Sequence, residues 1–228
     1  MTEIKWQKPL GLHDTVNFIP MDIRSMGYVP SEQEMLVLVG QIAGECYNSS
    51  MTDSACINRA LSCVGRGHHS PWEHVNITLN CIVDRGTSHA LVRHRHCAFQ
   101  QSSTIYQKYK DFINIIALPE TDPCNGETVP GISDIEIVGY QDLVDVYNSC
   151  INSKMQPGRA RDILPNALAT NLIITANMRQ WMYMLKRRVG SGDAVRMHVW
   201  ETITYDWFKA RYRRIVQAFD DWYEKHPL

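Results

Sequence analysis

The residues best suited to chemistry begin with a basic run, Arg93-His94-Arg95, which is followed after seven further residues by Ser103. Amide and hydroxyl side chains surround that serine, namely those of Gln100, Gln101, Ser102 and Thr104. Guanidinium groups make paired, permanently charged contacts with phosphate oxygens, and amides and hydroxyls add neutral hydrogen bonds. The pattern therefore predicts a cradle for a phosphate-bearing nucleotide. The alternative is a solvated, charged helix end, since charge runs are often only surface.

A second basic group lies in an otherwise apolar part of the chain. It consists of Arg159, Arg161, Asn177, Arg179, Lys186, Arg187 and Arg188. Cations are costly to bury without an anionic partner. Because the net charge is only −1, two such local groups indicate two phosphate-bearing ligands. Nucleic acid is not expected as a partner, because basic tails with interleaved aromatic residues are missing.

The elements that must position these groups can be traced from the N-terminal side. Ser31 and Glu34 fit a capping box ahead of an apolar stripe at helical spacing, which runs from Met35 to Cys46. A second, short helix is expected over Ala55–Val64. Two glycines and a proline within residues 65–71 then predict a loop.

Polar and apolar residues alternate from Val75 to Val83, which is typical of a half-buried strand. We expect residues 84–86 to turn the chain and a helix to begin at about Ser88. That helix would bury Leu91 and Val92 and carry the basic run at its end, followed by a polar stretch over residues 100–109.

The second half of the chain should contain a long loop and three helices. Residues 118–133 include three prolines and two glycines, so we expect them to form the loop and to contribute least to the core. Ile135–Met155 should be helical. A mainly apolar stretch over residues 170–176 should lead into a helix capped by Asn177, and a last long helix should run from Asp193 to about Lys225.

The basic run with Ser103 resembles the signature of the flavin-dependent thymidylate synthases, which is R-H-R, seven residues, then S. The same family is indicated by four blocks in the right order: His68-His69-Ser70-Pro71-Trp72-Glu73-His74-Val75, Asp84-Arg85-Gly86, Ala160-Arg161-Asp162-Ile163-Leu164-Pro165 and Asn177-Met178-Arg179. The resemblance implies an α/β (α+β) fold, in which one domain over residues 1–228 has a central, mostly antiparallel sheet flanked by helices. This is the thymidylate synthase-complementing protein fold.

The resemblance also implies the ligands and their residues. FAD would be bound by His68, Ser70, Arg93, His94, Arg95, Gln101, Asn177 and Arg179. The substrate dUMP would be bound by Arg93, Gln101, Ser102, Ser103, Arg161 and Arg188. Arg188 is the expected catalytic residue, because a guanidinium at a uracil oxygen stabilises the negative charge that makes C5 nucleophilic. Methylenetetrahydrofolate would donate the one-carbon unit and NADPH would reduce the flavin.

The chain departs from the family pattern at three positions. Ala90 stands where a Gln or Glu is common, Ile105 replaces an Arg, and Ala194-Val195 replaces an A-Q pair. Loss of a guanidinium–phosphate contact costs roughly 1.5–3 kcal/mol, unless Lys108 or Lys110 substitutes for it. Three alternatives therefore stay open: action on another pyrimidine nucleotide, hydroxymethyl transfer, or a non-catalytic flavin- or nucleotide-binding homologue.

Other classes are disfavoured by the sequence. The seven cysteines form no C-x-x-C pair, which argues against a disulfide framework and a zinc ribbon. The histidines near Cys97 lack a standard ligand spacing, so no metal is expected. The chain has no apolar run of signal-peptide or membrane-spanning length, so we expect a cytoplasmic protein without membrane contact. The resemblance further implies a homotetramer whose active sites are shared between chains.

Overall fold

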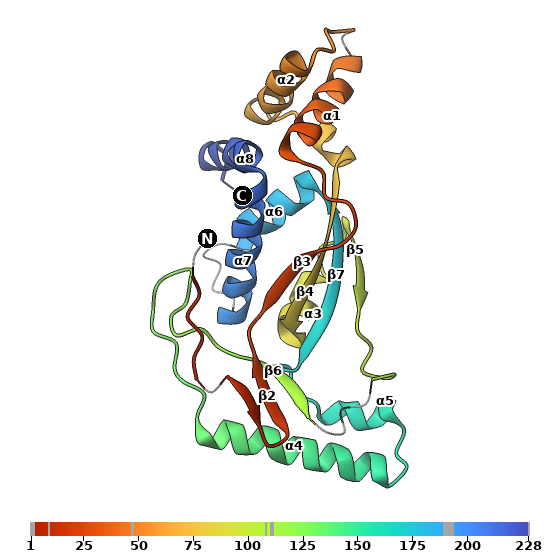
Figure 1. The fold of residues 1–228 in the computed structure, drawn as a ribbon, viewed down its shortest axis with the longest axis vertical. Helices are drawn as coiled ribbons and strands as arrows, with labels where there is room; N and C mark the ends of the chain where they lie inside the picture. The colour runs from red at the N-terminus through yellow and green to blue at the C-terminus, as the bar shows by residue number, and fades with distance from the viewer. Residues whose placement is uncertain are drawn as a thin grey trace.

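A four-stranded antiparallel sheet forms the centre of the fold, which confirms the expected α/β class (Figure 1). Its strands, in spatial order, are β3 (Asp22–Ser25), β4 (Asn76–Asp84), β7 (Ala169–Asn177) and β5 (Cys97–Gln101). The structure is a computed structural model that describes residues 3–8, 10–46, 48–107, 109, 112–188 and 194–227. The side chains of His13, Arg187 and Arg188 are outside this description.

Alternation along β4 and β7 gives this sheet one buried face. Leu79 of β4 pairs with Ile174 of β7, and both are fully buried. The other face is only partly buried and carries Thr78 and Thr175, whose hydroxyl oxygens are 2.8 Å apart. The alternating pattern over residues 75–83 therefore predicted both the strand and its inward face correctly.

Helices pack around this sheet and around a second, smaller sheet (Figure 1). They are α1 (Glu32–Glu45), α2 (Asp53–Gly65), α3 (Arg85–Leu91), α4 (Asp134–Asn152), α5 (Pro157–Ala160), α6 (Met178–Arg188), α7 (Val195–Arg211) and α8 (Arg213–Lys225). Two short 3-10 helices are η1 (Ser70–His74) and η2 (Arg161–Ile163). In Figure 1, α1 and α2 lie at one end of the molecule and α4 lies across the other end. No helix in the described ranges is long and apolar enough to cross a membrane.

A smaller sheet forms a second core against α4. Its strands are β1 (Gly11–His13), β2 (Val16–Ile19) and β6 (Ile113–Ile116), with β2 and β6 parallel. Phe18 and Ile115 are buried there together with Val144 of α4. A bridge between Ile115 and Leu168 joins this sheet to the segment that enters β7.

The capping residues in the sequence predicted the first residues of two helices correctly. The Ser31 hydroxyl accepts a hydrogen bond from the Glu34 amide, and the Glu34 carboxylate accepts one from the Ser31 amide at 2.7 Å. This is the predicted capping box of α1. Asn177 likewise caps α6, because its Oδ1 accepts a hydrogen bond from the Gln180 amide at 2.8 Å.

Three expectations about element boundaries were wrong. The helix expected from Ser88 begins at Arg85. The Asp84 carboxylate caps this helix, because it accepts a hydrogen bond from the Thr87 amide at 2.9 Å. It ends at Leu91, which leaves Val92 40% exposed rather than buried. The last helix is two helices, since the backbone at Tyr212 leaves the helical region with φ −132° and ψ 53°.

The loop over residues 118–133 is irregular but well anchored. Gln7 Nε2 donates hydrogen bonds to the carbonyl oxygens of Val129 at 2.8 Å and Pro130 at 3.1 Å. Asp122 is buried and lies 2.8 Å from Nδ1 of the buried His198 on α7. Val129 is also buried, so the expectation that this loop contributes least to the core was wrong for these residues.

Candidate functional site

A cavity of about 570 Å³ opens beside the first turn of α6 and is called the α6 cavity. Asn177 and Arg179, two residues expected to bind FAD, line it together with His69, Glu73 and His96. These residues come from β7, α6, η1 and the turn before β5. The cavity therefore collects polar and basic side chains that are far apart in the sequence.

Arg179 stands at the mouth of this cavity rather than in the core. It forms an ion pair with Glu73, and about half of each side chain is exposed. Arg159 is still more exposed, and Lys186 pairs with Asp220 at 2.8 Å. At these positions the cations of the basic group are therefore largely exposed or paired with a carboxylate.

The basic run lies next to the α6 cavity. Arg93, His94 and Arg95 form the turn between α3 and β5, with the His94 amide donating to the Leu91 carbonyl at 3.1 Å. They follow the helix end instead of lying on it. Arg93 and Arg95 are exposed, and neither has an ion-pair partner among the residues described. His96, directly after them, lines the cavity.

His68 and Ser70 flank the same region. The His68 amide donates to the Cys63 carbonyl at 2.8 Å, and Ser70 begins η1. Both side chains are exposed, whereas His69 between them is half-buried. The residues expected to bind flavin, apart from Gln101, therefore gather at one end of the central sheet.

The residues expected to bind the nucleotide gather elsewhere, apart from Arg93, which lies with the basic run beside the α6 cavity, and Arg188, whose side chain is outside the description. The hydroxyl cluster consists of Gln101, Ser102, Ser103, Thr104 and Arg161. Gln101 Nε2 donates to the Ser88 hydroxyl at 2.9 Å, and Arg161 lies 3.4 Å from the Thr104 hydroxyl. Thr104 is buried and Arg161 half-buried. The expected proximity of Arg161 to residues 101–104 is thus present in the fold.

These two groups lie at opposite ends of β5. Cys97 pairs with Ala176 next to the α6 cavity, whereas Gln101 pairs with Leu172. A strand of this length spans roughly 13 Å at about 3.3 Å per residue. Gln101, which was expected to touch both ligands, lies with the hydroxyl cluster. Within one chain, the flavin-type and nucleotide-type residues are separated.

The arginine expected to be catalytic is at the end of α6, but its side chain lies outside the described residues, as do Lys108 and Lys110. Ile105 is described and is 43% exposed. It lies near α5, since a Cβ added to Gly158 would be 4.0 Å from Ile105 Cγ1. The described residues thus leave the role of Arg188 as a prediction.

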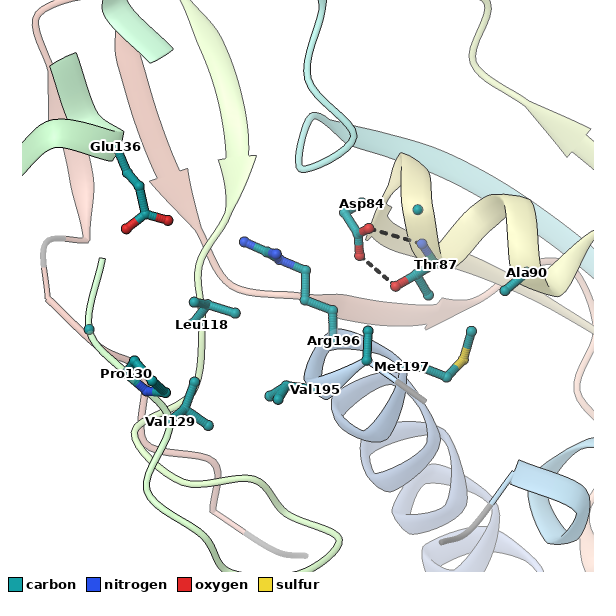
Figure 2. A pocket seen from close by; sticks show the side chains of 13 residues that line it. Asp84, Thr87, Ala90, Leu118, Val129, Pro130, Glu136, Val195, Arg196 and Met197 are labelled. Atoms are coloured by element: carbon teal, nitrogen blue, oxygen red, sulfur yellow. Dashed lines mark hydrogen bonds between the residues drawn. The ribbon is translucent and has the colours of Figure 1, made fainter. Parts of the chain in front are cut away.

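A second cavity of about 510 Å³ is lined by α3, the 118–133 loop and the start of α7 (Figure 2). Two of the departures from the family pattern, at Ala90 and at Ala194-Val195, line this one cavity. Figure 2 shows Arg196 extending from α7 toward Glu136. Hydrogen bonds from Ser133, together with the charge of Arg196, lower the pKa of Glu136. The loop is therefore part of a cavity wall.

Several residues of the α6 cavity were not indicated by the sequence. His69 and Glu73 belong to the motif around His68, yet only their neighbours were expected to bind a ligand. Trp222 and Tyr223 of α8 also line the cavity, and no sequence motif singled them out. Across the described part of the chain, no three His, Cys, Asp or Glu side chains lie close enough to hold a metal ion.

The seven cysteines contain no disulfide. Cys56 and Cys81 are buried, three others are half-buried, and Cys46 and Cys124 are exposed. Burial raises the pKa of Cys81 to about 12 and that of Cys97 to about 11. Thiolates at these two positions are therefore strongly disfavoured near neutral pH.

Comparison with known proteins places these features in context. Residues 29–196 match the model of the family described as thymidylate synthase complementing protein. The chain is 31% identical over 133 residues to a flavin-dependent thymidylate synthase of Mycobacteroides abscessus, covering 54% of this chain and 53% of the relative. It is 30% identical over 133 residues to that of Mycolicibacterium vanbaalenii, with the same coverage. The chain spans about half the length of the curated relatives it matches.

A solved structure has the same fold. It is described as the UMP/dUMP methylase PolB from Streptomyces cacaoi bound with 5-Br dUMP. The TM-score is 0.69 at 18% sequence identity, with 90% of this chain and 96% of that chain covered. At this identity the likeness shows the fold, and the arrangement of sheets and helices described above is the arrangement that is shared.

Proposed function

Because the chain belongs to the thymidylate synthase complementing protein family, we propose that it is an FAD-dependent enzyme that methylates dUMP to dTMP. Methylenetetrahydrofolate is the one-carbon donor and NADPH is the reductant. One observation carries this proposal beyond family membership: two separate polar sites stand at the two ends of β5, each with the residue types that its ligand requires.

The α6 cavity fits part of a flavin dinucleotide. Its volume of about 570 Å³ lies in the range of roughly 300–1,000 Å³ that is usual for ligand pockets. Arg179 lines it, and Arg93 and Arg95 stand beside it in the turn before β5. Guanidinium groups suit a pyrophosphate, and the Asn177 amide adds neutral hydrogen-bonding capacity. When bound, FAD supplies the carrier and hydride chemistry.

The hydroxyl cluster fits the nucleotide. Ser102 and Ser103 offer hydroxyl groups, Gln101 offers an amide, and Arg161 offers a positive charge beside them. Together they bind and orient dUMP. Arg188 stabilises the negative charge that develops on a uracil oxygen as C5 attacks, without itself losing a proton.

The separation of the two sites supports a homotetramer. The proposed reaction would require the flavin and the uracil ring to lie together, and one chain holds most of their expected binding residues at opposite ends of a strand. A neighbouring copy can bring its hydroxyl cluster to this chain's α6 cavity. We propose that each active site is shared in this way and that residues 1–228 form one domain, since elements on both sides of the family-matched segment pack onto the same core.

A second candidate is the same chemistry on a different pyrimidine nucleotide. Ile105 and Ala90 replace polar or charged residues of the family pattern, and the structural relative is described as acting on UMP as well as dUMP. Transfer of a hydroxymethyl group and a non-catalytic flavin- or nucleotide-binding role are the remaining alternatives. Each of these alternatives keeps the α6 cavity as a flavin or nucleotide site. They differ in whether the protein is an enzyme, in the group that it transfers, or in the nucleotide that the hydroxyl cluster binds.

The decisive experiment starts from the purified protein and its visible absorption spectrum. Flavin reduction by NADPH is then followed without oxygen, in the presence of dUMP, UMP, dCMP or no nucleotide. We expect bound flavin, faster reduction with dUMP, and dTMP once methylenetetrahydrofolate is added. A response to UMP or dCMP but not to dUMP would favour the second candidate. Absence of flavin binding would refute the proposal.

Arg188 is tested separately with Arg188→Met. Loss of one stabilising contact to the developing charge typically costs about 100-fold or more in kcat. We expect dTMP formation to fall by that order while the flavin absorbance of the protein is retained. An equal loss of flavin would instead assign Arg188 to cofactor binding.

A further inference from the structure

Two aromatic side chains of α8 line the α6 cavity. Trp222 and Tyr223 share its lining with the polar side chains of Asn177, Arg179 and Glu73. Helix α8 lies beyond the segment that matches the family model, which ends at residue 196. Nothing in the motifs of the chain assigns these rings a role.

Trp222 is held in a fixed position by three neighbours. Its ring meets the His69 ring edge-on, with centroids 5.1 Å apart, and stacks on His226 with centroids 3.7 Å apart. Gly67 lies beneath it with φ +76°, and a Cβ added there would come within 2.6 Å of Trp222 Cη2. The glycine therefore leaves the space that the indole occupies, and these contacts fix the orientation of the ring.

Tyr223 is positioned by Phe219, which lies one turn earlier on the same helix. Its ring stacks on the fully buried Phe219, with centroids 6.4 Å apart and an interplanar angle of 26°. Burial raises the pKa of the Tyr223 hydroxyl, while the charge of Arg179 opposes that rise. Tyr223 and Arg179 thus line the same cavity, and the charge of Arg179 acts on the Tyr223 hydroxyl.

A cavity whose lining combines aromatic rings held in place with a cation and amides suits one chemical class. Flat heteroaromatic rings stack on Trp and Tyr, and an attached phosphate pairs with Arg. Phe219 and Trp72 already fill the adjoining core. Trp222 and Tyr223, in contrast, are only half-buried, because part of their surface faces the cavity.

We propose that Trp222 and Tyr223 form a stacking wall that binds a heteroaromatic ring of the flavin dinucleotide, as a binding determinant supplied by α8. This inference rests on the proposed function of the α6 cavity. The ring is either the adenine or the isoalloxazine, and both would stack in the same way. The two sources are separated by ligands that contain only one of them.

The test is titration of the full chain, after removal of bound flavin, with FAD, FMN and ADP, followed by protein and flavin fluorescence. Base–aromatic stacking contributes enough that Trp222→Leu should weaken FAD binding by roughly 5- to 100-fold. Trp222→Phe keeps a ring and should retain most of the affinity. Tyr28→Leu is the matched control, because Tyr28 is 76% exposed and does not line the cavity.

A parallel loss of ADP affinity assigns the wall to adenine, and a parallel loss of FMN affinity assigns it to isoalloxazine. Unchanged FAD affinity in a Trp222→Leu protein with a wild-type thermal midpoint overturns the inference while leaving the proposed function intact. If Trp222→Leu fails to fold, Tyr223→Leu is judged by the same criterion. A wild-type protein that binds none of the three ligands overturns both proposals.

Discussion

Specificity in the proposed reaction depends on individual side chains around the hydroxyl cluster. Ile105 is 43% exposed and lies beside α5. It therefore presents an apolar side chain at a position where the family commonly has an arginine. Arg161 is the cation that the structure places with this cluster. In the proposed site, the nucleotide phosphate would therefore have fewer charged partners within the described part of the chain than the family pattern provides.

Restoring the missing charge should strengthen nucleotide binding. We expect Ile105→Arg to tighten dUMP binding by about tenfold or more, because a charge-assisted hydrogen bond contributes roughly 1.5–3 kcal/mol. Calorimetric titration with dUMP measures this. Ile135→Arg on α4 is the control, since Ile135 is 84% exposed and outside both cavities. Equal gains in both variants would point to a general effect of net charge.

His69 links the α6 cavity to the pH dependence of stability. Burial lowers its pKa, and the charges of Arg179, His226 and His68 act in the same direction, against the Val64 carbonyl. Because the folded pKa of His69 is below the unfolded value of 6.5, the stability that this residue contributes is fully present above pH 6.5. It is lost as the pH falls below 6.5 and through the folded pKa.

This predicts a larger acid-induced loss in the wild type than in His69→Gln. Thermal midpoints are compared at about pH 7.5 and about pH 5.5, on either side of the unfolded pKa. The wild-type midpoint should fall further between the two values. Identical falls would show that other groups account for the pH dependence.

At the scale of elements, the 118–133 loop is fixed by a few buried polar contacts. Asp122 and His198 are both buried and 2.8 Å apart, and this pair ties the loop to α7. The same loop forms a wall of the second cavity, next to Ala90 and Val195. Its anchoring therefore bears on the shape of that cavity as well as on stability.

Asp122→Ala should lower the free energy of unfolding by about 1–3 kcal/mol, because it leaves a buried histidine without its partner. We also expect faster protease cleavage between residues 118 and 133. Urea denaturation and limited proteolysis measure the two effects. Glu127→Ala changes an exposed acidic residue of the same loop and should alter neither. An unaltered cleavage rate in Asp122→Ala would mean that the other contacts of the loop, including those with Gln7 and Lys5, are enough to hold it.

At the scale of the whole molecule, the α6 cavity and the hydroxyl cluster lie at opposite ends of β5, although the proposed reaction needs their ligands side by side. Shared sites make a specific prediction about mixed assemblies. Arg179→Ala impairs the α6 cavity and Ser103→Ala impairs the hydroxyl cluster. Each variant alone should lose most activity, whereas unfolding and refolding them together should restore part of it, since some sites then combine two intact halves.

Light scattering of the wild type should give the mass of four chains. If the refolded mixture is as inactive as either variant, each site is built within one chain and the tetramer proposal fails for catalysis. Refolded wild-type protein serves as the control for recovery.

The sequence by itself determined the features that depend on neighbouring residues. Ser31 and Asn177 cap helices through contacts three residues away, and the alternation over residues 75–83 sets which face of β4 is buried. The basic run and Ser103 indicated the family directly, because their order and spacing are properties of the chain. These interactions join residues that are close in the sequence, so the local residue types specify them.

Only the tertiary structure decided which of these features meet. The pairing of β5 with β7 separates the basic run from Ser103, although they are close in sequence. The packing of α8 brings Trp222 to Gly67 and His69, which are more than a hundred residues away. Such contacts depend on strand register and on how buried surfaces fit together. Apolar residue types alone do not specify them, because many pairings would bury the same side chains.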